Sequence, residues 1–143
     1  MKHPFELLIL SLTAALALTS CDKEDAKKKG AKPATGIVGT WKLVSRACYC
    51  APTPTPDETV VFTGTDFSFY KQGQLGGRGT YTKVPVSICG SSTLAPGLHF
   101  TYLTSNSLFS NALLTIKGDT LTLDYGLPCD APRESYVRLA SAK

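Results

Sequence analysis

The five cysteines of this chain are the residues with the widest choice of chemistry. A cysteine forms a disulfide, binds zinc or acts as a nucleophile, and its compartment and neighbours decide which. Zinc sites usually add histidine ligands or leave a gap of roughly two to four residues between paired cysteines. Cys48 and Cys50 have a single residue between them, and beyond the first twenty residues the chain has one histidine, His99. The pattern therefore favours disulfides over a metal centre.

Patterns for acid–base or phosphate chemistry are weak in this sequence. His99 lies in an alternating segment, 98–102, that points it away from its apolar neighbours, and the pair Asp57-Glu58 fits the solvated edge of a strand. The glycine-rich stretch around Arg78 is not followed by a helix that would present amides to a phosphate. Catalysis usually needs titratable groups held within reach of one another. The sequence therefore predicts a non-enzymatic protein without a cofactor or a metal, and an enzyme ranks behind the binding functions considered below.

Residues 1–20 have the pattern of a secretory signal peptide. Lys2 and His3 precede an apolar run, 7–18, that is too short to span a membrane, which takes about 20 apolar residues. The run ends in Leu-Thr-Ser-Cys at 18–21, which resembles the lipobox of bacterial lipoproteins. The resemblance implies cleavage before Cys21 and acylation of that cysteine, which anchors the protein to a membrane without spanning it. A soluble secreted protein with an unmodified Cys21 is the alternative.

Residues 21–35 are expected to form a flexible tether, because charged side chains, glycine and proline leave little to bury. Charged residues after a lipidated cysteine resemble a surface-export signal of one large group of Gram-negative bacteria, whereas in other groups an aspartate at the position of Asp22 retains the lipoprotein at the inner membrane. We expect a cell-envelope protein, at the outer rather than the inner membrane, with its domain in the periplasm or at the cell surface. An exported chain with four further cysteines favours two disulfides among Cys48, Cys50, Cys89 and Cys129.

Residues 36–143 are expected to form one small domain. Nine basic side chains stand against seven acidic ones in this part of the chain, too small an excess to indicate nucleic-acid binding. A helical apolar period is absent over any window of about ten residues. Runs of β-branched and aromatic residues between Gly, Pro, Asn and Asp instead predict strands. They are placed at 39–50, 57–63, 66–71, 75–84, 98–104, 111–117, 120–125 and 134–140.

Eight strands joined by tight turns predict an all-β fold, a small up-and-down antiparallel barrel, with a two-sheet sandwich as the alternative. Gly39-Thr40-Trp41 at the start and Arg138 near the end resemble the calycin, or lipocalin-like, pattern. Without a long helix before the last strand, the better match is the short lipocalin-like domain of bacterial lipoproteins. The resemblance implies that Gly39 opens the first strand, that Trp41 closes one end of the barrel, and that Arg138 packs over the Trp41 ring.

Barrel closure predicts a register and, with it, a disulfide. If the first and last strands pair antiparallel with Trp41 beside Arg138, Cys50 falls opposite Cys129. Cys48 and Cys50 would point the same way along an extended strand, which is poor geometry for a bond between them. We therefore favour a Cys50–Cys129 bond.

The remaining bond would then join Cys48 to Cys89. In a plain meander the link that carries Cys89 lies at the closed end of the barrel, whereas Cys48 lies toward the mouth. Segment 85–97 would have to climb the barrel wall, which its 13 residues allow at roughly 3.3 Å each. The exchanged pairing, Cys48–Cys129 with Cys50–Cys89, meets the same difficulty.

Two features favour a binding function. An eight-stranded barrel either fills its interior with side chains, which short strands favour, or leaves space for one small ligand. The aromatic candidates for lining such a space are Phe62, Phe69, Tyr81, Phe100 and Tyr102. The alternating prolines of 51–56 predict a stiff link, which in a lipocalin-like barrel crosses the mouth as a lid, a partner-binding edge or a simple connector.

The expected protein is a membrane-anchored monomer that takes a small apolar or amphipathic ligand. The mouth of the barrel would be formed by loops 51–56, 72–76, 104–111 and 126–133. The alternative is a protein–protein module, such as an inhibitor of an exported hydrolase, which resembles small lipoprotein barrels that act through their rim loops. Both expectations depend on the resemblance of the fold.

Overall fold

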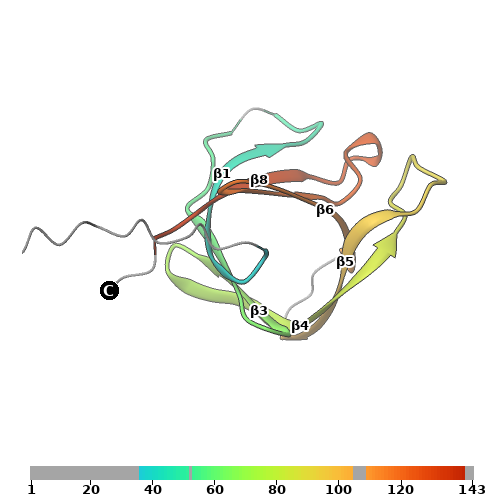
Figure 1. Ribbon diagram of the computed structural model, residues 1–143. Helices are drawn as coiled ribbons and strands as arrows, with labels where there is room; N and C mark the ends of the chain where they lie inside the picture. The colour runs from blue at the N-terminus through green and yellow to red at the C-terminus, as the bar shows by residue number, and fades with distance from the viewer. Residues whose placement is uncertain (1–35, 52, 105–108, 141–143) are drawn as a thin grey trace, which may run out of the picture. The chain divides into compact units, whose positions relative to one another are not determined.

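The computed structural model describes residues 36–51, 53–104 and 109–140, so the expected signal peptide, Cys21 and the tether lie outside the described residues. Eight antiparallel strands close into a barrel in which each strand pairs with its neighbours in sequence and β1 pairs with β8 (Figure 1). The predicted up-and-down barrel is confirmed, and the two-sheet sandwich is excluded. In the part of the chain that the structure describes, no helix is long and apolar enough to cross a membrane.

The strand boundaries follow the prediction closely except at β1 and at the β4–β5 hairpin. β1 ends three residues early, and β4 and β5 extend further than expected. The elements are β1 (Gly39–Ala47), β2 (Glu58–Phe62), β3 (Asp66–Lys71), β4 (Gln74–Val86), β5 (Ala95–Thr104), β6 (Asn111–Lys117), β7 (Thr120–Asp124), the short 3-10 helix η1 (Leu127–Cys129) and β8 (Arg133–Arg138).

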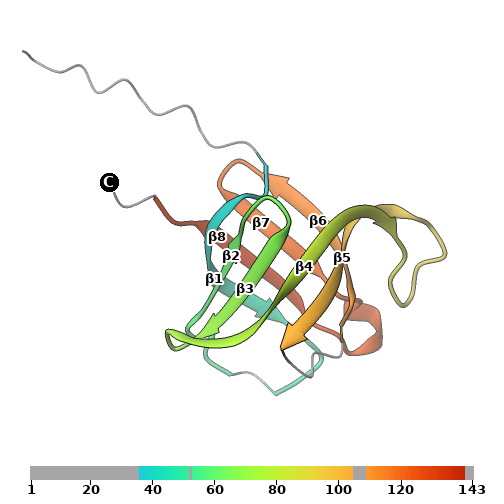
Figure 2. The ribbon, with the colours of Figure 1, turned by 90° about the horizontal axis from the view of Figure 1, so that it is seen from below.

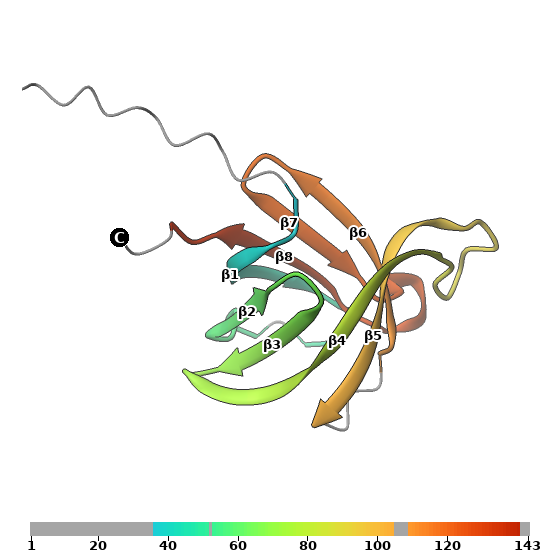
Figure 3. The ribbon, with the colours of Figure 1, turned by 60° about the horizontal axis from the view of Figure 1, so that its bottom comes forward.

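The β4–β5 hairpin extends past its neighbours as a two-stranded ribbon (Figures 2 and 3). β3 pairs with β4 no further than Thr80, and β6 pairs with β5 no further than Gly97. Pro85 and Pro96 stand opposite each other beyond these points. Proline lacks the N–H that a third strand would need and is tolerated at such free edges. The prolines therefore allow the ribbon to continue where the sequence suggested a break.

The predicted register between β1 and β8 holds only for the first half of the pairing. Trp41 pairs with Arg138 and Leu43 with Tyr136, as expected. A bulge at Val44 then shifts the register by one residue, so that Arg46 stands opposite Glu134. A bulge places one extra residue in one strand and reverses which side chains face inward beyond it.

The closed end of the barrel is fixed by Trp41 and Arg138. Trp41 is fully buried, and its indole Nε1 donates a hydrogen bond of 2.7 Å to the carbonyl of Ile37. The Arg138 guanidinium lies 4.0 Å from the centroid of the Trp41 ring and donates to the carbonyls of Val38 (2.7 Å) and Gly36 (2.6 Å). The contact implied by the family resemblance is therefore present.

Gly39 has a physical reason to be glycine at this end. Its φ is +140°, a conformation that side chains disfavour, and a Cβ atom there would lie 2.7 Å from Nη1 of Arg138. The missing side chain leaves room for the guanidinium between the chain entering β1 and the Trp41 ring.

The predicted disulfide pairings are wrong: the structure joins Cys48 to Cys50 and Cys89 to Cys129. β1 ends at Ala47, so Cys48 and Cys50 lie in a bend where the chain is no longer extended. Their Cα atoms are 5.2 Å apart, within the ordinary range for a bridged pair. The rule that alternate strand residues point the same way therefore does not apply to them.

The second bond shows how Cys89 reaches the mouth side of the barrel. The tip of the β4–β5 ribbon packs on the link between β7 and β8, where a Cβ atom on Gly90 would lie 3.0 Å from Pro128. The Cα atoms of Cys89 and Cys129 are 5.9 Å apart. Segment 85–97 therefore brings Cys89 to the link between β7 and β8, and its partner is Cys129 rather than Cys48.

Asp124 organises the link that carries Cys129. One carboxylate oxygen accepts hydrogen bonds from the backbone N–H groups of Gly126 (3.0 Å) and Leu127 (3.1 Å), and the other accepts from Nε of Arg133 (2.7 Å). Burial alone would raise the pKa of Asp124, but these donors lower it below its usual value. The charged carboxylate therefore fixes the turn that leads into β8.

Candidate functional site

The barrel interior is divided into a packed half and a hollow half. The side chains buried near the closed end include Phe62, Phe67 and Phe100. The Tyr81 hydroxyl donates a hydrogen bond of 2.7 Å to the carbonyl of Thr63. Three of the five residues expected to line a ligand site, Phe62, Tyr81 and Phe100, thus belong to the packed half. The other two, Phe69 and Tyr102, line a pocket above them.

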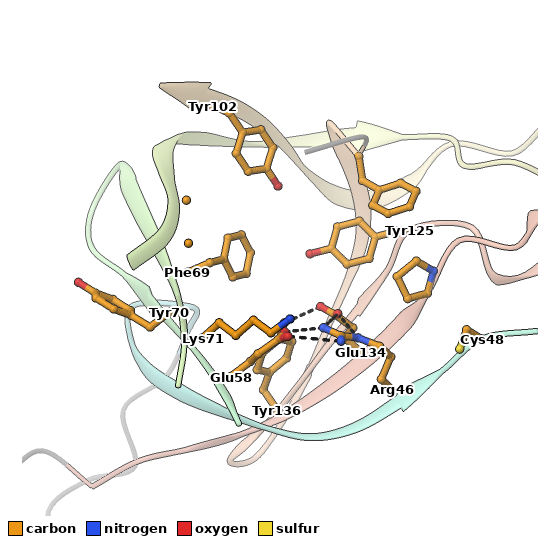
Figure 4. Close-up of a pocket in the computed structure, with 14 residues that line it drawn as sticks. Arg46, Cys48, Glu58, Phe69, Tyr70, Lys71, Tyr102, Tyr125, Glu134 and Tyr136 are labelled. Atoms are coloured by element: carbon orange, nitrogen blue, oxygen red, sulfur yellow. Dashed lines mark hydrogen bonds and ion pairs between the residues drawn. The ribbon is translucent and has the colours of Figure 1, made fainter. Parts of the chain in front are cut away.

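The hollow half is a pocket of about 510 Å³ at the end opposite Trp41 (Figure 4). The first residues of β2 and β8 and the last residues of β1 and β3 form its rim, because these strands all begin or end there. The lining residues are Arg46, Cys48, Glu58, Phe69, Tyr70, Lys71, Gly76, Gly77, Tyr102, Phe109, Tyr125, Pro132, Glu134 and Tyr136.

One wall of the pocket is charged. Nε of Arg46 donates to Oε1 of Glu134 at 2.7 Å, and Nη2 of Arg46 lies 2.5 Å from Oε2 of Glu58. The hydroxyl of Tyr136 donates to the other oxygen of Glu134 at 2.5 Å. Neighbouring strands β2, β1 and β8 contribute the three charged side chains, which gather on one side of the pocket in Figure 4.

The bulge at Val44 places Arg46 in this wall. Trp41 and Leu43 face inward, so strict alternation would continue with Ser45 and Ala47, but those two residues are exposed and Arg46 is partly buried. Strict alternation therefore does not predict an inward Arg46. Glu134 and Glu58 do share the inward faces of Tyr136 and Val60, although Glu58 was expected at a solvated strand edge. The available signal was that all three charges lie near the same end of neighbouring strands.

Burial and charge together fix the protonation of Arg46 and of two tyrosines in the pocket. Burial would lower the pKa of Arg46, but the hydrogen bond to Glu58 and the charge of Glu134 outweigh it and raise the pKa above its usual value. Burial raises the pKa of Tyr136 and of Tyr125 well above the usual tyrosine value. The pocket therefore combines a permanent cation with neutral phenols.

Aromatic rings form the opposite wall. Phe69 and Tyr102 each meet Phe67 of the packed half edge-to-face, with centroid distances of 5.3 Å and 5.0 Å. Tyr125 lies 5.4 Å from Phe109 by the same measure. Because two of these rings rest on the core, the wall is held open rather than free to collapse. In Figure 4, Phe69 and Tyr102 stand across the pocket from the charged wall, and Tyr125 lies between Tyr102 and Glu134.

The proline-rich link after β1 borders a second hollow, a groove of about 450 Å³ outside the mouth. The groove is lined by Tyr49, Pro54, Pro56 and Leu127 among others, while Pro52 lies outside the described residues. Tyr49 is 74% exposed on the turn that the Cys48–Cys50 bond closes. This edge presents an exposed aromatic side chain on a cross-linked turn.

His99 faces outward, as expected from its place in β5. It is exposed, and its Nδ1 lies 2.8 Å from Oδ1 of Asn111 on β6. Within 36–51, 53–104 and 109–140, no group of three or more His, Cys, Asp or Glu side chains is placed to hold a metal ion. His99 and Asn111 are paired on the outer surface, away from the pocket.

No protein-family model, curated protein or solved structure matches this chain. The lipocalin-like family and the lipid anchor therefore stay predictions from the sequence. The geometry of the pocket is the basis on which a function can be proposed.

Proposed function

We propose that this protein is a membrane-anchored, non-enzymatic binding protein whose barrel holds one small amphipathic ligand in the pocket at its open end. The observation that carries the proposal is the division of the interior: large aromatic side chains fill one half, while the other half keeps a pocket of about 510 Å³. Pockets that bury small molecules generally measure about 300–1,000 Å³.

The two walls of the pocket support an amphipathic rather than a purely apolar ligand. Phe69, Tyr102 and Tyr125 offer an apolar surface, and transfer of a hydrocarbon tail onto it would gain about 25 cal/mol for each Å² removed from water. Arg46 and Glu134 on the facing wall offer polar contacts to a head group. A fully apolar ligand would leave these charges buried without water, which is costly.

The Tyr102→Ala variant tests the proposal. Tyr102 lines the pocket, whereas its neighbour Leu103 is 69% exposed on the outer face of β5. We expect Tyr102→Ala to weaken binding of an amphiphile about tenfold, equivalent to about 1.4 kcal/mol, because it removes a ring from the tail-binding wall. Displacement of a neutral fluorescent dye measures the affinity, with Leu103→Ala as the matched control. Equal affinities in both variants would place the ligand elsewhere.

The anchor is tested by Cys21→Ser. We expect this change to move the protein from the membrane fraction to the soluble fraction of the cell envelope, since a serine at this position lacks the thiol that would be acylated. The fractions are compared by immunoblot, with Cys89→Ser as the control for loss of a cysteine. Membrane retention of the Cys21→Ser protein would show that lipidation is not the anchor.

The rim supports the second candidate, a protein–protein module such as an inhibitor of an exported hydrolase. Tyr49 is the observation in its favour, because an exposed aromatic residue on a rigid turn is a frequent centre of interfaces. A column that carries residues 36–143 should then retain a secreted protease or lysozyme, and Tyr49→Ala should abolish retention. Passage of a panel of such hydrolases without retention would count against this function.

A further inference from the structure

We propose that the pocket selects a ligand whose polar group donates hydrogen bonds, a hydroxyl or an ammonium group, and discriminates against a free carboxylate. The inference deepens the proposed function and depends on it. Its evidence is the way in which Arg46, Glu58 and Glu134 satisfy one another.

Arg46 has little left to offer an anionic ligand. Its Nε and Nη2 contact Oε1 of Glu134, and its Nη1 and Nη2 contact the two oxygens of Glu58. An arginine has five N–H donors, and these contacts occupy most of them. A ligand carboxylate would have to displace Glu134 or Glu58, whose side chains are only 8% and 19% exposed, and would leave a buried charge unpaired.

The two glutamates leave acceptors rather than donors facing the pocket. Each ionised carboxylate can accept about four hydrogen bonds and donates none. Glu134 accepts from Arg46 and from the Tyr136 hydroxyl, and Glu58 accepts from Arg46, so lone pairs stay available on both residues. A hydroxyl or ammonium group satisfies such acceptors, whereas a carboxylate repels them.

The other polar groups of the pocket do not reverse this preference. Among the described lining residues, the remaining cation is Lys71, which is exposed, stands opposite Glu58 in the β2–β3 register and reaches toward Glu58 in Figure 4. Attraction between an anionic head and a solvated lysine is weak. The neutral Tyr125 hydroxyl either donates or accepts, so it fits either kind of head group.

Three ligands with the same tail test this inference at pH 7.5: decanol below its solubility limit, and decylammonium and decanoate below their critical micelle concentrations. Displacement of a neutral fluorescent dye from residues 36–143 gives the affinities. We expect decanol or decylammonium to bind at least about tenfold more tightly than decanoate. The difference in affinity between decanol and decylammonium shows whether the pocket prefers a neutral or a cationic hydrogen-bond donor.

The outcomes separate the inference from the proposed function. Decanoate binding that is as tight as, or tighter than, binding of the other two would overturn the inference and leave the binding function standing. Failure of all three ligands, together with failure of the dye to bind, would overturn both.

A pair of neighbouring variants provides the second test. Glu58→Gln adds an amide donor and loosens Arg46 from one partner, so we expect the disadvantage of decanoate to shrink about fivefold. Asp57→Asn removes the same charge one residue earlier, where Asp57 pairs with Lys42 outside the pocket. The Asp57→Asn change should leave the affinity of decanoate relative to the other two ligands unchanged. Thermal unfolding of both variants checks that the fold is kept. An equal change of the relative decanoate affinity in both variants, or no change in either, would contradict the inference.

Discussion

Replacement of Trp41 by alanine is expected to lower the free energy of unfolding by about 3–5 kcal/mol, the usual range for loss of a large buried aromatic side chain. Trp41 is fully buried, its indole donates a hydrogen bond to Ile37, and its ring carries the Arg138 guanidinium. The variant would leave a cavity at the closed end, and the Arg138 guanidinium would lose the ring on which it packs. Urea unfolding followed by circular dichroism measures the loss without relying on tryptophan fluorescence.

Tyr49→Ala is the control for this experiment, because it removes another aromatic residue of the same stretch that is 74% exposed. Its cost should stay within about 0.5 kcal/mol, as for most surface changes. A loss below about 1 kcal/mol for Trp41→Ala would mean that this residue does not close the barrel, since a buried aromatic side chain of its size contributes more than that.

The Gly79→Ala variant should lose about 3 kcal/mol of stability, at the upper end of the range for overpacking. A Cβ atom at Gly79 would collide with the carbonyl oxygen of Thr101 and lie 3.0 Å from Cα of Tyr102 on β5. Both are backbone atoms, so the clash is relieved only if β4 and β5 move apart. That movement would also displace Tyr102 from the pocket wall, and dye affinity should fall with stability.

Gly64→Ala is the matched control in the turn between β2 and β3. A Cβ atom there has no neighbour within 4 Å and its φ is not in the left-handed region, so the change should be neutral or slightly stabilising. Thermal unfolding compares the two variants. Equal melting temperatures for Gly79→Ala and Gly64→Ala would show that β4 and β5 do not approach as closely as described.

The barrel could be predicted from the sequence because its signals are local. Short alternating segments separated by turn residues, such as the Gly118-Asp119 hairpin, define strands and their order without reference to distant contacts. The two ends of the chain resemble the lipocalin-like pattern, and this resemblance predicted the contact of Trp41 with Arg138 and the first half of the β1–β8 register.

The candidate site was harder to predict because it depends on a one-residue bulge in the backbone of β1. The bulge at Val44 turns Arg46 inward and brings it to Glu134, and no feature of the sequence around Val44 demands a bulge. The same irregularity, with the end of β1 at Ala47, removed the basis for the predicted Cys50–Cys129 bond. Long-range geometry, rather than residue type, decided both outcomes.

Nuclear magnetic resonance titration of residues 36–143 with decanol would show whether a single amphiphile occupies the open half of the barrel. We expect saturable shift changes with one-site behaviour at the rings of Phe69, Tyr102 and Tyr125, and an unchanged Trp41 indole N–H at the packed end. Shift changes confined to a separate groove on the β4–β5 ribbon, which Val84 and Leu94 line, or no saturable change at the three rings, would contradict the proposed site.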